Sequence, residues 1–205
     1  MTTLVVIAKE PRPGRVKTRL TPPFTPRQAA ALAEAALADT LTAVAATPAA
    51  RRVLVLEGRP GPWLPPGFDV VRQCGGGLDE RLADAFAGCD GPALLIGMDT
   101  PQVTPRLLDV DFDECDAWFG PAEDGGFWAL GMAEPDPRLV RGVPMSTQAT
   151  GAVQRQRLLA AGLRVRDLPR LRDVDTADDA AAVAAEAPDG GFAARLSRLT
   201  AGSDR

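Results

Sequence analysis

The apolar positions along the chain follow two kinds of pattern, short continuous runs and helical spacing, which predict strands and helices in turn. Short apolar runs are typical of buried strands, and the first such run spans residues 4–8. Thr25 and Pro26 mark the start of an Ala- and Leu-rich helix that runs to about residue 46. Further strands are predicted at 52–56, 68–72, 92–97, 116–120, 127–131 and 163–168, and further helices at 78–87, from 105, from Ser146 or Thr147 to about 161, and at 176–186. This order predicts a three-layer α/β/α sandwich with a mainly parallel central sheet.

The predicted elements leave no interdomain linker and no internal repeat. The chain has 205 residues, of which 45% are hydrophobic and 24% charged, as in an ordinary soluble globular protein. We therefore expect a single domain over residues 1–187. Residues 188–205 are expected to form a C-terminal tail with a short helix or frayed ends.

Charge and residue usage exclude several classes of function. The net charge is −4, which argues against a general nucleic-acid binder. The chain has no histidine, so Ser-His-Asp and Cys-His catalysis and histidine zinc sites are excluded. Any chemistry must rest on carboxylates, lysine, arginine, hydroxyls, backbone amides or a metal held by oxygen.

The same features suggest a cytoplasmic protein. Cys74, Cys89 and Cys115 match neither a zinc spacing nor a disulfide framework. No apolar run is expected to reach the roughly 20 residues of a membrane span, and the N-terminal strand lacks the basic segment of a signal peptide.

Positive charge is concentrated in the loop that follows the first strand, residues 9–20. Ligands of open α/β sheets bind at the carboxyl ends of strands, which is where this loop starts. It is neither a Walker A motif nor Gly-x-Gly-x-x-Gly, so its positive charge comes chiefly from side chains. The loop is predicted to hold phosphates; the alternative is a solvated basic loop. Its cationic residues are Lys9, Arg12, Arg15, Lys17 and Arg19.

Carboxylates follow two other strands and are candidate metal ligands. Asp99 ends a strongly apolar strand, where an unpaired carboxylate is costly; its alternative role is to cap a turn. Asp173 and Asp175 alternate, so they would point to opposite faces if the backbone is extended. One of them could complete a site for Mg²⁺ or Mn²⁺ with Asp99, while the other or Thr176 caps the next helix.

Two further acidic segments have weaker chemical signals. Glu123 and Asp124 lie in a Gly-rich turn, and they could contact a sugar or acceptor hydroxyl or serve the turn alone. The alternating aspartates of residues 109–113 resemble an Asp-x-Asp metal motif, but a surface loop there is typical of a solvated charged segment.

Four segments together resemble a bacterial glycosyltransferase-like family. That family is related to nucleotidyltransferases, including the guanylyltransferases that activate phospholactate or phosphoenolpyruvate and the molybdopterin nucleotidyltransferases. The resemblance implies the GT-A, nucleotide-diphospho-sugar transferase fold, a divalent metal, and an NTP or NDP-sugar. The matching segments are Ala8-Lys9-x-Pro-x-Pro-Gly14-x-Val16-Lys17-Thr18-Arg19-Leu20, Gly97-Met98-Asp99-Thr100-Pro101, Gly120-Pro121-x-x-Asp124-Gly125-Gly126-Phe127 and Asp173-Val174-Asp175-Thr176.

The resemblance also implies roles for individual residues. Asp99 corresponds to the metal aspartate, and the second metal position falls on Asp175, with Asp173 as the less favoured candidate. Lys17 and Arg19 would neutralise phosphates during catalysis, and Asp124 would orient the acceptor. The implied nucleotide- and phosphate-binding set is Ala8, Lys9, Gly14, Arg15, Lys17, Thr18, Arg19 and Gly97.

Three hypotheses for function follow. The leading one is metal-dependent nucleotidyl transfer from an NTP to a small anionic acceptor. The close alternative is glycosyl transfer from an NDP-sugar. The third is a non-catalytic nucleotide-binding protein on a decayed enzyme fold.

Overall fold

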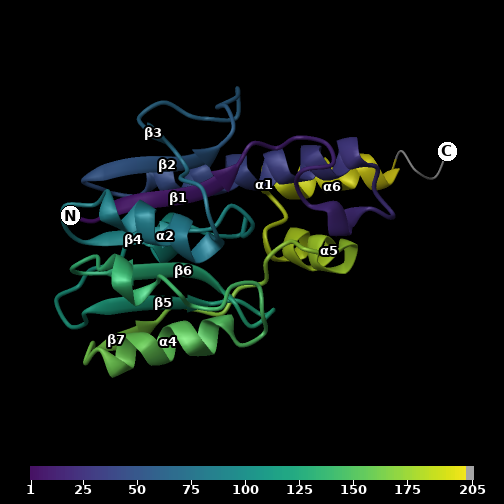
Figure 1. Cartoon of the computed structure of the whole chain (residues 1–205). Helices are drawn as coiled ribbons and strands as arrows, with labels where there is room; N and C mark the ends of the chain where they lie inside the picture. The colour runs from purple at the N-terminus through teal and green to yellow at the C-terminus, as the bar shows by residue number, and fades with distance from the viewer. Residues whose placement is uncertain (202–205) are drawn as a thin grey trace.

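The strands form one twisted sheet at the centre of the molecule (Figure 1). The computed structural model describes residues 1–201. The sheet order is β3-β2-β1-β4-β6-β5-β7. Its strands are β1 (Thr3–Lys9), β2 (Arg51–Glu57), β3 (Asp69–Arg72), β4 (Ala93–Ile96), β5 (Ala117–Pro121), β6 (Phe127–Met132) and β7 (Val165–Asp167).

Most neighbouring strands are parallel, as predicted. The exception is β6, which runs antiparallel to both β4 and β5 because a short turn connects it directly to β5. The carboxyl ends of β1 and β4 therefore lie beside the start of β6, at the same end of the central strands.

Helices cover both faces of the sheet and confirm the three-layer architecture. Alternate residues of β1 face opposite layers: Leu4 and Val6 pack into a cluster with α1, and Val5 packs into a cluster with α2. The helical segments are η1 (Thr18–Leu20), α1 (Pro26–Ala46), α2 (Leu78–Ala87), α3 (Pro105–Leu108), η2 (Pro137–Leu139), α4 (Thr150–Ala160), α5 (Ala177–Glu186) and α6 (Gly191–Ala201).

A third apolar cluster lies beyond the sheet, where α1, α5 and α6 meet. Figure 1 shows α6 running alongside α1. Phe192 and Leu196 of α6 are buried in this cluster together with Leu20 from η1 and Val174 from the segment before α5. The cluster therefore ties the C-terminal helix to two segments that carry candidate site residues.

Helix α1 corrects the expectation that no run is long and apolar enough to span a membrane. By length and composition alone α1 qualifies, but 56% of its most apolar window is buried inside the protein. Leu37 and Leu41 pack on the sheet, and Leu32 packs toward α5 and α6. We therefore interpret α1 as a core helix.

The start of α4 also differs from the prediction. Neither Ser146 nor Thr147 caps this helix, which begins at Thr150 with Ala149 as its N-cap. The Thr150 hydroxyl instead donates to the Pro144 carbonyl at 2.8 Å and accepts from the Thr147 amide at 3.0 Å. Residues 144–149 are thereby held as an ordered loop.

Candidate active site

The basic loop turns its one buried cation inward. Lys17 has a left-handed backbone with φ 47°, and its side chain is only 9% exposed. Its Nζ donates to Asp99 Oδ2 at 2.7 Å and to Asp175 Oδ1 at 3.0 Å. Burial opposes the charge, but the attraction of the two carboxylates outweighs it and holds the pKa of Lys17 above its usual value. The structure thus brings together three residues that the sequence nominated from distant segments.

Arg19 joins the same group from the outside. Its Nη1 donates to Asp175 Oδ2 at 3.0 Å, while its side chain stays 76% exposed. Asp175 therefore accepts from a buried lysine on one oxygen and from an exposed arginine on the other. The backbone adds a further link, because the Val174 amide donates to the Asp99 carbonyl at 2.9 Å.

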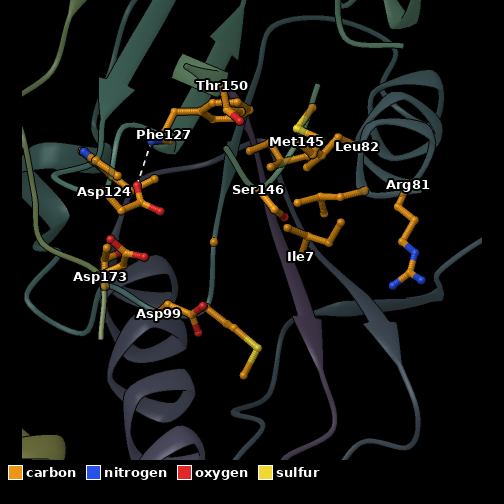
Figure 2. Close-up of a pocket in the computed structure, with 18 of the residues that line it drawn as sticks. Ile7, Arg81, Leu82, Asp99, Asp124, Phe127, Met145, Ser146, Thr150 and Asp173 are labelled. Carbon is orange, nitrogen blue, oxygen red and sulfur yellow. Dashed lines mark hydrogen bonds between the residues drawn. The ribbon is translucent and has the colours of Figure 1, made fainter. Parts of the chain in front are cut away.

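Asp175 also belongs to an acidic cluster with Asp124 and Asp173. One carboxylate oxygen from each of the three lies within 4.8 Å of the others. Burial, followed by the nearby charges of Asp124 and Asp175, raises the pKa of Asp173 to about 6. Figure 2 shows Asp124 and Asp173 facing each other, with Asp99 nearby.

The alternation argument for Asp173 and Asp175 was wrong. In an extended backbone residues two positions apart point to the same face, and Asp173 and Asp175 accordingly lie on one side of the chain, while Val174 between them is buried on the other. Thr176 caps α5 through a capping box with Asp179, which leaves both acids available to a ligand. Asp173, the less favoured metal candidate, is therefore grouped with Asp175, whereas Asp99 reaches Asp175 through Lys17.

Two buried oxygens beside this cluster have no hydrogen-bond partner. They are Asp99 Oδ1 and Thr100 Oγ1, and both residues line the cavity. Thr100 is 1% exposed, so its hydroxyl loses most of its water. Orphaned polar atoms are costly in a protein interior and point to a bound group. With the carboxylates, they make an all-oxygen donor set that fits Mg²⁺ or Mn²⁺.

The aspartates of the site lie where two hollows in the protein surface, a cavity and a groove, meet. A cavity of about 350 Å³ has apolar walls from Ile7, Leu82, Phe127 and Met145, which Figure 2 shows around it. A groove of about 620 Å³ lies along the basic loop and is lined by Lys9, Arg15, Lys17, Thr18 and Arg19. Asp99, Asp124 and Asp175 line both the cavity and the groove, which together form the cleft.

The other predicted residues divide between the cleft and its surroundings. Ala8 and Gly97 line the cavity. Gly14 lines neither hollow and has a left-handed backbone with φ +74°. Glu123 pairs with Arg172 at 2.6 Å instead of facing the cleft. Residues 109–113 also lie outside both hollows, in agreement with their interpretation as a surface segment.

Sequence reasoning missed two contributors to the cavity. Ser146 has a φ of 58°, and among the described non-glycine residues only Lys17 shares this left-handed conformation. Such strained backbones concentrate at functional sites. Arg81 lies at the end of the cavity opposite the acids and is held by Glu57 at 2.8 Å (Figure 2). No sequence pattern pointed to Arg81, because a charged residue at its position in the predicted helix is typical of a solvent-exposed surface.

Comparisons with known structures identify proteins of the same fold. A protein from Desulfovibrio desulfuricans G20 described as a nucleotide-diphospho-sugar transferase is 27% identical, with a TM-score of 0.76 over 86% of this chain and 84% of that one. A CMP:2-keto-3-deoxy-manno-octonic acid synthetase complexed with CTP is 12% identical, with a TM-score of 0.57 over 92% of this chain and 100% of that one. A 2-C-methyl-D-erythritol 4-phosphate cytidylyltransferase from Thermus thermophilus is 17% identical, with a TM-score of 0.54 over 90% of this chain and 98% of that one.

These likenesses confirm the expected nucleotide-diphospho-sugar transferase fold, which the chain shares with transferases of nucleotides and nucleotide sugars. A search of the curated proteins found no match. Residues 29–147 match the model of the family described as "Uncharacterized protein conserved in bacteria (DUF2064)", which covers more than half of the chain. The chain belongs to the DUF2064 family.

Proposed function

We propose that this protein is a metal-dependent nucleotidyltransferase that moves a nucleotide from an NTP to a small anionic acceptor. The observation that carries the proposal is the junction of a cationic groove and an apolar cavity at a cluster of carboxylates. The fold supports it, because two of the similar structures are a synthetase with CTP bound and a cytidylyltransferase.

The cleft divides into parts that suit an NTP. The groove would hold the phosphates with Lys9, Arg15, Lys17 and Arg19, and the apolar cavity would take the flat, apolar parts of the reactants. Asp99 and Asp175 would hold the cation, with Asp173 and Asp124 beside Asp175. When bound, Mg²⁺ or Mn²⁺ supplies positive charge to the phosphates and to the leaving pyrophosphate.

The chemistry requires little from the protein beyond position and charge. An ionised acceptor oxygen attacks the α-phosphorus, a new P–O bond forms, and the bond to the β-phosphate oxygen breaks to release pyrophosphate. No general base is needed for an acceptor that is already ionised, which fits a chain without histidine. Lys17 and Arg19 would stabilise the leaving charge. The acceptor-orienting role of Asp124 stays a prediction.

The direct test is release of pyrophosphate. The protein is incubated with each of the four NTPs, Mg²⁺ or Mn²⁺, and a panel of phosphorylated and carboxylated acceptors. We expect pyrophosphate from at least one pair, and its loss in Asp175→Asn but not in Asp113→Asn, an acid outside the cleft. No pyrophosphate from any pair would contradict the proposal.

Glycosyl transfer from an NDP-sugar is the second candidate. It is favoured by the 27% identical structure described as a nucleotide-diphospho-sugar transferase. The same groove would hold the leaving diphosphate. A thermal-shift screen separates the two reactions, because stabilisation by NDP-sugars but not by NTPs would reverse their order.

A non-catalytic nucleotide-binding protein is the remaining alternative. It predicts nucleotide binding that survives in both Asp99→Ala and Lys17→Ala, with no turnover in the wild type. We further propose that the protein works in the cytoplasm on small molecules, which fractionation of the cells would test.

A further inference from the structure

Lysine is almost absent from this protein, except in the cleft. The chain has 23 basic residues, and only Lys9 and Lys17 are lysines. Both line the groove. Lys9 is 52% exposed and pairs loosely with Glu57 at 3.6 Å. Lys17 is the buried one, and a lysine differs from arginine in carrying a compact point charge on a flexible stem.

Lys17 occupies the place that a bridging cation would take. Its Nζ lies 2.7 Å from Asp99 Oδ2 and 3.0 Å from Asp175 Oδ1, so one ammonium joins two carboxylates from different strand ends. The same two aspartates were the leading metal ligands by sequence. The carboxylates that a divalent cation needs are thus already neutralised by the chain itself.

The neutralisation by Lys17 is incomplete. Asp99 Oδ1 stays buried without a partner although Oδ2 receives the ammonium, and the Thr100 hydroxyl beside it is unpartnered as well. Asp173 and Asp124 add further negative charge against Asp175. The site is therefore held together by one buried ammonium and, from outside, by the exposed Arg19 guanidinium on Asp175, where the oxygens present could satisfy a stronger cation.

We propose that Lys17 is a built-in counter-cation that holds Asp99 and Asp175 in the free protein and is displaced when a divalent cation binds there. The ammonium stabilises a cleft that would otherwise carry several unpaired carboxylates, and it lowers the affinity for metal alone. In the proposed reaction the released ammonium turns to the phosphates, so metal and nucleotide favour each other's binding; this last step rests on the proposed function.

The first test measures Mn²⁺ binding without nucleotide. Free Mn²⁺ is followed by electron paramagnetic resonance in the wild type, Lys17→Met and Lys9→Met. Both variants remove one charge from the same groove, but only Lys17 contacts Asp99 and Asp175. We expect Lys17→Met to bind Mn²⁺ about tenfold more tightly than Lys9→Met does. Equal affinities in the two variants, or weaker binding by Lys17→Met, would overturn the proposal.

The second test needs no variant and guards against misfolding of Lys17→Met. Brief acetylation of the wild type labels amines, and mass spectrometry compares Lys17 with Lys9 as an internal reference. We expect added Mg²⁺ to raise the labelling of Lys17 relative to Lys9, since displacement opens Lys17 Nζ to solvent, where it can lose a proton and react as the amine. An unchanged or lower ratio would contradict displacement. Both tests omit nucleotide, so their outcome is independent of whether nucleotidyl transfer is observed.

Discussion

Replacing Leu20 by alanine should weaken both the fold and the phosphate groove. Leu20 follows Lys17-Thr18-Arg19 directly and is 0% exposed in the cluster where α1, α5 and α6 meet. The change removes three buried carbons, worth about 0.8 kcal/mol each, or about 2.4 kcal/mol in transfer free energy. The cavity left behind raises the expected loss of unfolding free energy to about 3–4 kcal/mol. For a chain of this length the Tm should fall by about 10 °C.

Ligand binding distinguishes a local effect of Leu20 from a general one. Leu158 on α4 is also 0% exposed, but it packs in the cluster with α2, away from the basic loop. Leu158→Ala should cost similar stability while leaving Lys17 and Arg19 in place. Thermal unfolding by circular dichroism gives the Tm, and calorimetry with inorganic tripolyphosphate and Mg²⁺ at 15 °C gives the affinity.

We expect tripolyphosphate binding to weaken in Leu20→Ala and to stay near the wild-type value in Leu158→Ala. If both variants lose affinity equally, or if Leu20→Ala keeps the wild-type Tm, then Leu20 does not anchor the groove and the reasoning fails.

Three further changes test other parts of the structure. Gly151→Ala should lower the free energy of unfolding by about 2 kcal/mol in a urea titration, because the added Cβ would lie 2.5 Å from the Gly126 carbonyl oxygen in the turn after Asp124. Gly75→Ala is the control, because its Cβ would meet nothing within 4 Å, and it should change that free energy by under about 0.5 kcal/mol. Thr176→Ala removes the cap of α5 and should cost about 1 kcal/mol, again by urea unfolding, whereas an unchanged midpoint would exclude a capping role. The hydrogen bonds from Arg164 lower the pKa of Asp116 from 3.8 to about 2, so its contribution to stability is present above pH 4 and is lost as the pH falls toward 2. The Tm difference between the wild type and Asp116→Asn should therefore shrink over that range, and a constant difference would contradict the linkage.

Local sequence signals predicted most of the fold. The helix Leu78–Ala87 begins and ends where the apolar spacing placed it, and Thr25 with Pro26 starts α1 as a capping box. These features depend on neighbours within a few residues. The antiparallel course of β6 was not predicted, because the short turn after β5 reverses the chain but does not show that β6 then inserts between β5 and β4. The start of α4 was misplaced because Thr150, not Ser146 or Thr147, fixes the preceding turn.

The candidate site was predictable only in part. Charge and position after a strand were enough to nominate Lys17, Asp99 and Asp175. Their mutual contacts depend on a left-handed backbone at Lys17, which has no clear sequence signal, and on which distant segments the fold brings side by side. Short-range patterns therefore identify the charged residues, while long-range packing decides which charges meet.

The apolar residues inside the charged motifs explain how the basic and acidic side chains are held in contact. In Lys17-Thr18-Arg19-Leu20 the basic side chains face the groove and Leu20 faces the cluster with α6. In Asp173-Val174-Asp175 the two acids face the cleft and Val174, 2% exposed, enters that same cluster. One apolar contact region thus fixes the basic and the acidic segments relative to each other. Because Phe192 and Leu196 complete this region, helix α6 supports the site although no residue of α6 lines either hollow and the family match ends at residue 147. We therefore expect truncation of Phe192 or Leu196 to weaken tripolyphosphate binding, although both residues lie beyond Asp175, the last charged residue of the cleft.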